Sequence, residues 1–172
     1  MRQVYDTLLT RRSCRSYTDQ PISAEDMQTI LRAGVYAPSA MNRQGRQLTV
    51  VRTKSNMDAL AVAMGRVLAR PDYHFYHPVA LVIVSDEPGN PNNGFDCACA
   101  LENMFLMAHA LGIGSCWINQ MKDAENDPEV RGLLSAFGVP ADHHVYGMAA
   151  LGYAAAPSRE ADKSAQVVHF AD

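Results

Sequence analysis

Apolar residues recur along the chain with two spacings, and each spacing predicts a different kind of element. Five segments place apolar side chains three and four residues apart, which is the spacing of one helix face. Three of these segments carry start signals, namely Ser23 with Asp26 three residues later, Ser55, and Asp127 followed by Pro128. Counting these caps and the proline or glycine that stops a helix, we expect helices over residues 3–9, 23–38, 55–69, 95–112 and 127–138.

Runs of β-branched and other apolar residues predict strands over residues 47–51, 79–85, 115–118, 143–153 and 166–170. The run VALVIVS at 79–85 shows no polar alternation, which is typical of a central strand buried on both faces. Helices and strands mix along the chain without a strict strand–helix–strand alternation. The pattern therefore favours an α+β fold over a doubly wound parallel sheet.

Composition narrows the class of protein. The 172 residues are 48% hydrophobic and 19% charged, with a net charge of −3, which predicts one globular domain over residues 1–172. This mildly acidic chain gives no sign of the basic face that binds nucleic acid. No apolar run reaches about 18 residues and no charged leader precedes an apolar segment, so we expect neither a membrane span nor a signal peptide. The four cysteines form no C-x-x-C pair, which favours reduced thiols and a cytoplasmic location.

Positive charge gathers near the N-terminus, although the chain as a whole is acidic. Arg11, Arg12 and Arg15 surround Ser13 in the sequence RRSCR. One interpretation is a solvated charge run that closes the first helix, since cations favour a helix C-terminus. The other is an anion site, because an extended stretch points residues 11, 13 and 15 to one face, where guanidinium and hydroxyl groups suit a phosphate or a polar ring edge. The residues alone leave both interpretations open.

Two further segments carry polar or glycine-rich chemistry. The loop APSAMNRQ offers the hydroxyl of Ser39 and the amides of Asn42 and Gln44 just before a strand. The segment GIGSCW at 112–117 differs from a dinucleotide-binding loop, because its glycines follow a helix and lead into a strand. We expect Gly112 to stop the helix and to leave the backbone that follows it free to approach a ligand.

Other catalytic signatures are missing from the sequence. The histidine pairs His74–His77 and His143–His144 lack partners at metal-ligand spacing, so we expect no metal site. Neither a G-x-S-x-G elbow nor a phosphate-binding P-loop occurs, which leaves acyl transfer and phosphoryl transfer without support.

Taken together and in order, the motifs resemble those of the FMN-dependent nitroreductase family. The chain has RRSCR where the family has R-[RH]-S-x-[RK], APSAMNRQ where it has A-P-S-x-x-N-x-Q, and a long helix that ends in GIGSCW. LGYAAAPSR then matches the family's strand and basic loop near the C-terminus. The resemblance covers nearly the whole chain. It implies a nitroreductase-like α+β fold, with a central, mostly antiparallel sheet flanked by helices, in an intertwined homodimer.

The resemblance also implies an FMN site at each subunit interface. It places basic and hydroxyl side chains of one subunit, a loop of the partner and the backbone of a strand around the flavin, and extends the C-terminal tail onto the partner. The residues so implied are Arg11, Arg12, Ser13 and Arg15, then Pro38, Ser39, Ala40, Met41 and Asn42 from the partner, Cys116, Trp117, Ile118 and Asn119 beside the ring, and Arg159 at the phosphate.

The implied activity is electron transfer from NADH or NADPH to a small electron-poor acceptor, such as a nitroaromatic or a quinone, by a ping-pong mechanism. The flavin carries the redox chemistry, so no side chain need act as nucleophile or base. A non-catalytic flavin-binding or storage protein stays open as an alternative, as does a specialised dehydrogenase or flavin-modifying branch of the scaffold. Two departures from the family stand out: Gly45 replaces a common proline, and Lys163 is the only lysine or arginine after Arg159.

Overall fold

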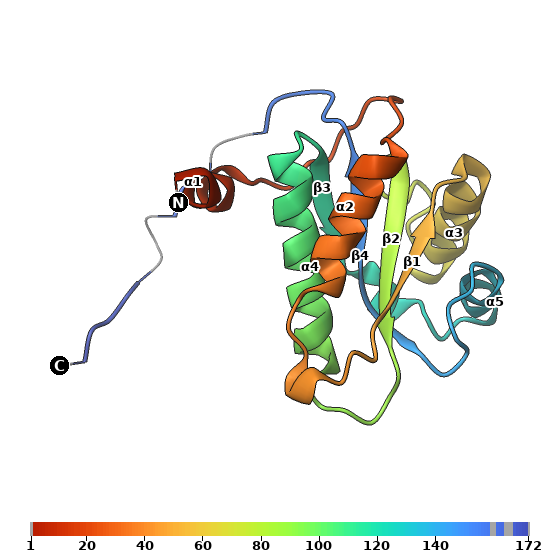
Figure 1. Cartoon of the computed structure of the whole chain (residues 1–172). Coiled ribbons are helices and arrows are strands. Elements are labelled where there is room, and N and C mark those ends of the chain that lie inside the picture. Colours follow the sequence, from red (N-terminus) through yellow and green to blue (C-terminus); the bar gives the residue numbers. More distant parts are fainter. Residues whose placement is uncertain (1, 159–160, 164–166, 172) are drawn as a thin grey trace.

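Four strands form one sheet in the order β1-β2-β4-β3 within residues 2–158, 161–163 and 167–171, the part of the chain that the computed structural model describes (Figure 1). Each pair of neighbouring strands is antiparallel. The strands are β1 (Gln47–Val51), β2 (Ala80–Asp86), β3 (Gly114–Ile118) and β4 (His144–Gly152). The expected α+β class and antiparallel sheet are confirmed.

Helices cover both faces of this sheet. α2 (Ala24–Val35) and α4 (Asn93–Ala110) pack on one face, and α3 (Lys54–Val67) and α5 (Pro128–Ala136) pack on the other (Figure 1). The short 3-10 segments η1 (Ala40–Asn42) and η2 (Gln120–Asp123) follow α2 and β3, and α1 (Arg2–Thr10) lies outside these layers. None of the described helices combines the length and the apolar composition that crossing a membrane requires.

β2 lies at the centre of the core. All of its residues are buried, and successive side chains of a strand point to opposite faces of the sheet. Leu81 and Ile83 pack with α3 and α5, whereas Val82 and Val84 pack with α2 and α4. Burying each of these side chains contributes about 1.5–3 kcal/mol. The predicted central strand, buried on both faces, is confirmed.

Local capping signals set several helix ends as predicted. The Ser23 hydroxyl accepts a hydrogen bond from the Asp26 backbone N–H at 3.0 Å and donates one to the Asp26 carboxylate at 2.7 Å. The Asp127 carboxylate accepts from two backbone N–H groups in the first turn of α5. Gly112 has a φ of 74°, and α4 ends there in the Schellman motif that such a residue permits.

One predicted helix start is wrong, and one predicted stop lies slightly outside its helix. α3 begins at Lys54 with Thr53 as its N-cap, so Ser55 lies inside the helix instead of capping it. The chain turns into α3 almost as soon as β1 ends, which places the Thr53 carbonyl as the first acceptor of the helix. α2 ends at Val35, shortly before Pro38, which agrees with the predicted stop, because the residue preceding a proline disfavours the helical conformation.

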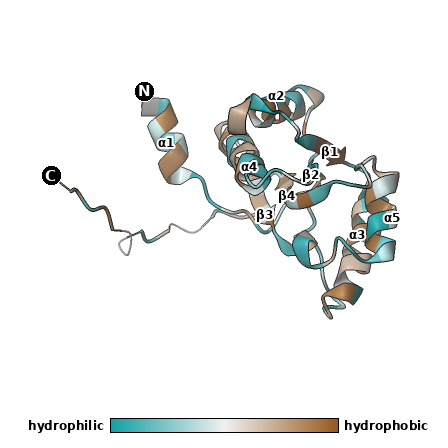
Figure 2. Ribbon diagram, turned by 90° about the horizontal axis from the view of Figure 1, so that it is seen from below, coloured by the Kyte–Doolittle hydropathy of each residue, from teal (hydrophilic) through white to brown (hydrophobic). Residues whose placement is uncertain are grey.

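The strand predicted over 166–170 is absent from its described residues, 167–170, and Gln166 lies outside the described residues. A strand needs a neighbouring edge to supply hydrogen-bond partners. Here Val167 and Phe170 are 89% and 81% exposed, and the tail extends away from the sheet on the same side as α1 (Figures 1 and 2). Val4 and Leu8 of α1 are also more than half exposed. Two exposed apolar segments on one side of the molecule mark an interaction surface.

Candidate functional site

Residues 11–15 run beside the outer edge of β3. Ser13 forms a parallel bridge with Ser115, and the Cys14 N–H donates to the Ser115 carbonyl at 2.8 Å. The Cys14 side chain is buried, whereas Ser13 and Arg15 are exposed. The predicted alternation of side chains is therefore present at residues 13–15.

A glycine and a tyrosine hold this stretch against the sheet. A Cβ on Gly114 would lie 2.8 Å from the Cys14 Cβ, so the close approach requires glycine. The Tyr17 hydroxyl donates towards the carbonyls of Cys14, at 2.8 Å, and Ala150 of β4, at 3.1 Å. Burial raises the pKa of Tyr17 far above its ordinary value, with a smaller contribution from the Cys14 thiol, so the phenol keeps the proton that it donates.

The arginine stretch lines a cavity of about 650 Å³ together with a segment near the end of the chain. Ser158 and Lys163 come from that segment and face the same space as Arg11, Arg12 and Arg15. The volume is in the range of small-molecule and cofactor sites, and the lining is strongly cationic. The structure therefore supports the interpretation of the arginine cluster as an anion site.

Arg11 and Arg12 make contacts that serve both interpretations of the cluster. Arg11 Nε lies 3.3 Å from a carboxylate oxygen of Glu102 on α4. Arg12 Nη1 donates to the carbonyls of Leu9, at 2.7 Å, and Arg11, at 2.6 Å, so Arg12 does close α1. The Nε atom of Arg12, however, is buried and lacks a hydrogen-bond partner among the described residues. A buried donor without a partner lowers the stability of the folded protein by about 1–3 kcal/mol, unless a ligand accepts its hydrogen bond.

β3 carries the residues expected beside the flavin ring. Cys116 and Ile118 are buried, Trp117 is 38% exposed, and Asn119 is exposed just beyond the strand. β4 pairs with one edge of β3, and on the other edge the described chain supplies the Ser13 bridge alone. Backbone groups on that edge are therefore available to a ligand.

The loop of Pro38, Ser39, Ala40, Met41 and Asn42 lies at the other end of α4 from the arginine stretch (Figure 1). The Ala40 N–H donates to both carboxylate oxygens of Asp96, at 3.1 and 3.0 Å, in the first turn of α4. Met41 and Asn42 adopt left-handed conformations with φ of 55° and 54°, and Met41 is 88% exposed. A single protomer thus does not bring this loop to the arginines.

Two charged residues that sequence reasoning missed hold this loop in place. Arg46 donates to the carbonyls of Ala37 at 2.7 Å, Pro38 at 2.6 Å and Asp96 at 2.9 Å, while the Asp96 carboxylate binds Ala40. These bonds stabilise the left-handed residues of the loop. The one signal in the sequence was an acidic residue near the start of a helix, where the helix dipole favours it.

Gly45 has a structural reason to replace the common proline of the family. A Cβ at this position would lie 2.6 Å from a carboxylate oxygen of Asp86, whose side chain is 3% exposed. Burial raises the pKa of Asp86, although a hydrogen bond from the Glu87 N–H and the nearby His143 act in the opposite direction. Glycine therefore permits a close approach to a buried carboxyl group.

Arg159, expected at the phosphate, lies outside the described residues, so its role stays a prediction. Lys163 borders the cavity and is a cation to which sequence reasoning gave no firm role. Its place after Arg159 in a basic loop was the available signal.

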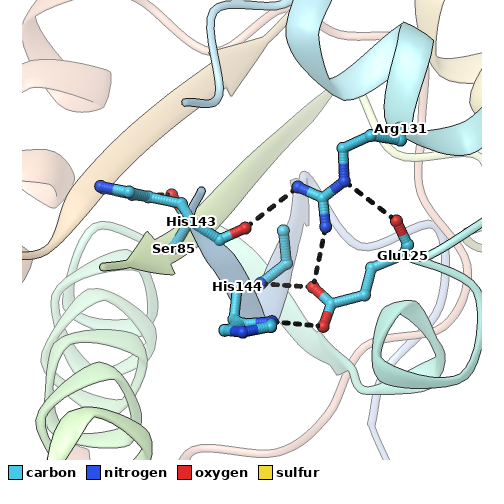
Figure 3. A network of polar contacts seen from close by, with 6 residues as sticks. Ser85, Glu125, Arg131, His143 and His144 are labelled. Carbon is cyan, nitrogen blue, oxygen red and sulfur yellow. Dashed lines mark hydrogen bonds and ion pairs between the residues drawn. The ribbon is translucent and has the colours of Figure 1, made fainter. Parts of the chain in front are cut away.

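A second polar cluster ties the start of β4 to α5 and the turn before it (Figure 3). Glu125 is 7% exposed, accepts a hydrogen bond from the Val145 N–H at 2.7 Å and lies 3.0 Å from His144 Nδ1. Arg131 donates to the carbonyls of Glu125 at 3.1 Å and His143 at 3.0 Å. These contacts serve the fold, and they give His144 a carboxylate partner that the sequence did not reveal.

Comparison with known proteins points in one direction. The family model described as Nitroreductase family matches residues 8–153. A protein from Archaeoglobus fulgidus, provisionally named NADH dehydrogenase/NAD(P)H nitroreductase, is 33% identical over 160 residues, which cover 89% of this chain and 86% of that protein. A relative of the same name from Methanothermobacter thermautotrophicus is 29% identical, over 88% of this chain and 78% of its own length.

The solved structures that resemble this chain include nitroreductases as well. A nitroreductase with bound FMN from Bacteroides fragilis superposes with a TM-score of 0.91 at 41% identity, covering 98% of each chain. A nitroreductase with bound FMN from Desulfitobacterium hafniense has a TM-score of 0.87 over 99% of this chain and all of its own. Its identity is 22%, so it supports the fold alone.

Proposed function

Because this chain belongs to the nitroreductase family, we propose that it is an FMN-dependent oxidoreductase that passes electrons from NADH or NADPH to a small electron-poor organic acceptor. The observation that carries the proposal is the cationic cavity, at which the buried Nε of Arg12 has no hydrogen-bond partner among the residues that the structure describes. An FMN phosphate and the electron-rich edge of its ring are the kind of groups that such guanidinium donors bind.

The residues around the cavity fit FMN. Arg12, Lys163 and the Ser158 hydroxyl would hold the phosphate, and Arg159 would join them. The Arg15 guanidinium lies over the Tyr76 ring, 5.9 Å from its centroid, and would serve the polar edge of the flavin ring. The open edge of β3 would supply backbone hydrogen bonds to the same ring.

The partner subunit would complete each site. The loop at residues 38–42 lies away from the arginine stretch of its own chain. Its left-handed backbone is fixed by hydrogen bonds, and its exposed Met41 would be able to contact the partner subunit. The exposed apolar residues of α1 and the tail would be covered by the second copy. These features support a homodimer with flavin sites at the interface.

FMN would supply the redox chemistry when bound, accepting a hydride from NAD(P)H and passing two electrons to an acceptor that enters after NAD(P)⁺ has left. The chain's own residues bind and orient. Arg15 would stabilise negative charge at the ring edge, and Tyr17 and Gly114 hold residues 13–15 in place. Burial raises the pKa of the Cys116 thiol, and the nearby Arg15 acts in the opposite direction, so the protein disfavours the thiolate form of this residue.

A spectrum and two half-reactions test the proposal. The purified protein should take up FMN and show flavin absorbance in the visible range. NADH or NADPH should bleach that absorbance without oxygen, and a quinone should restore it. Initial rates at several acceptor concentrations should give parallel double-reciprocal lines. A protein that takes up no FMN would overturn the proposal, and one that binds FMN without being reduced would be a flavin-binding protein.

We also propose a cytoplasmic location for this protein. Cys14, Cys97, Cys99 and Cys116 are all free, and three of them are buried. Reduced thiols of this kind are typical of a reducing compartment. Fractionation of the source cells, followed by immunoblotting, would test the location.

A further inference from the structure

The segment that joins α3 to β2 carries backbone strain. Ala69, Tyr76 and His77 are non-glycine residues with φ of 52°, 66° and 54°. Side chains other than glycine disfavour this conformation, and it persists where the surrounding structure holds it. A Cβ on Gly65 would lie 2.7 Å from the Arg70 carbonyl, so the segment folds tightly back on α3. Strain of this kind is commonly kept where a binding surface needs it.

This segment forms one wall of a second cavity, of about 350 Å³. It is lined by Arg70, Tyr73, His74 and Tyr76 of this segment, by Ile118 at the end of β3 and by Gln120 at the start of η2. The volume suits a small aromatic molecule. Tyr76 also lies under Arg15, which borders the larger cavity. The second cavity therefore adjoins the place where the flavin ring is proposed to lie.

Polar and ring contacts position Tyr73 and His74 in this cavity. The Tyr73 hydroxyl donates to the side-chain oxygen of Gln120 at 3.4 Å, and its ring meets Phe75 edge-on at 5.4 Å. The Tyr76 N–H donates to His74 Nδ1 at 2.9 Å. Rings held in this way offer faces and edges to an aromatic ligand.

Arg70 supplies the cation of this cavity. It takes part in none of the ion pairs between described residues. Arg70 is exposed and lines the cavity together with Tyr73 and Tyr76. Burial raises the pKa of Tyr73, whereas the charge of Arg70 acts to lower it. Asp72 borders the same cavity and is the one carboxylate among its lining residues.

We propose that this cavity receives the electron acceptor and that Arg70 selects aromatic acceptors that carry a carboxylate. The inference rests on the proposed function and adds the substrate class. The guanidinium would bind the carboxylate through two parallel hydrogen bonds, and Tyr73 and Tyr76 would pack against the ring. With a nitroaromatic acid as acceptor, NAD(P)H and one proton together supply two electrons and two protons. The nitro group is reduced to a nitroso group, and one of its oxygens leaves as water.

The test compares 4-nitrobenzoate with 4-nitrobenzamide, which has the same ring but no charge. Arg70→Gln should lower kcat/KM for 4-nitrobenzoate about tenfold, as expected for a lost charge-assisted hydrogen bond. It should leave kcat/KM for 4-nitrobenzamide within about twofold. Arg66→Gln is the matched control, because it removes the same charge from the last turn of α3 at a residue that pairs with Glu129 outside the cavity. Both acceptors should react normally with the control.

Binding gives a readout that does not depend on turnover. Calorimetric titration with benzoate should show a weaker Kd for Arg70→Gln than for the wild type and for Arg66→Gln, and benzamide should not distinguish the three. Equal losses with both acceptors, or a loss of FMN content in Arg70→Gln, would overturn the inference and assign the cavity to the flavin itself. A wild type that binds FMN and reduces neutral acceptors but does not prefer the acid would also overturn it, with the proposed function intact.

Discussion

At the scale of single residues, this chain places charge where the neighbouring structure does not neutralise it. Arg12 shows the arrangement best: one nitrogen closes α1, while its Nε stays buried without a partner in the described chain. Arg70 takes part in none of the ion pairs between described residues, and the Arg15 guanidinium lies over the ring of Tyr76. An acidic protein that keeps such cations free near cavities is prepared for anionic ligands.

Arg15→Ala should weaken FMN retention. Losing a charge-assisted hydrogen bond at the ring edge corresponds to about 1.5–3 kcal/mol, or a rise of roughly ten- to a hundredfold in the Kd for FMN. Fluorescence titration of the flavin measures this directly, with Arg66→Ala as the charge-matched control. An unchanged Kd would remove Arg15 from the proposed site.

Asp86 should make the stability of the protein depend on pH. Because burial raises the pKa of this carboxyl above its model-peptide value of 3.8, the folded state binds its proton more tightly than the unfolded state does. The contribution of Asp86 is therefore favourable below about pH 3.8 and is lost as the pH rises through the folded-state pKa. The free energy of unfolding of Asp86→Asn, relative to that of the wild type, should therefore increase as the pH rises. Urea unfolding of both proteins between pH 4 and 7 measures this difference. A difference that does not change with pH would contradict this explanation.

At the scale of elements, glycine decides how closely segments approach. Gly114 lets the arginine stretch lie against β3, whereas Gly132 sits in α5 with open space where its Cβ would be. The same substitution should therefore have opposite effects at the two positions.

Gly114→Ala should lower the free energy of unfolding by about 1–3 kcal/mol, since the added methyl overlaps Cys14. It should also weaken FMN binding by displacing residues 13–15. Gly132→Ala should instead raise the free energy of unfolding by about 0.5–1 kcal/mol, as alanine is the better helix former. Urea unfolding of both variants, with flavin titration beside it, provides the comparison. Stabilisation by Gly114→Ala would mean that residues 11–15 do not pack as described.

The elements also show what a sequence can predict. Ser23 with Asp26, Asp127 and Gly112 act on backbone within a few residues, so their pattern identified helix ends correctly. The sequence does not predict the roles of Arg46 and Asp96, because their partners depend on how η1 packs on α4. Arg46 and Asp96 are hydrogen-bonded to each other although they lie 50 residues apart in the chain. The cavity beside Tyr73 was missed for the same reason. The β-branched residues of the tail predict a strand, but a strand also needs a neighbouring edge, and the described strands do not pair with residues 167–170.

At the scale of the whole molecule, two exposed apolar segments share one side. α1 and the tail both extend from the layered body on the same side of the molecule (Figure 2). Their apolar residues would be unfavourable in water unless a second surface covers them. In the proposed homodimer, the same second copy would bring the loop at residues 38–42 to the arginine stretch, so dimer formation would both cover α1 and complete the site.

Replacing Val168 and Phe170 together by Asp should weaken the dimer, because both side chains are more than three-quarters exposed in the single chain and would be buried against the partner. Sedimentation velocity should show more monomer at low concentration, and FMN content should fall in parallel. Val62→Asp, on exposed α3 surface, is the control and should remain dimeric. A monomeric variant that retains FMN would contradict the shared site.

The position of the two half-sites at opposite ends of α4 has a genetic consequence. In a symmetric pair, each flavin would use the arginine stretch of one copy and the loop of the other. A variant defective in the first and a variant defective in the second would each be inactive alone. Co-expressed, they would form mixed pairs in which one site carries both defects and the other carries neither. Random pairing makes about half of the pairs mixed, so about a quarter of all sites regain wild-type composition. Two null alleles of this single gene would then complement each other.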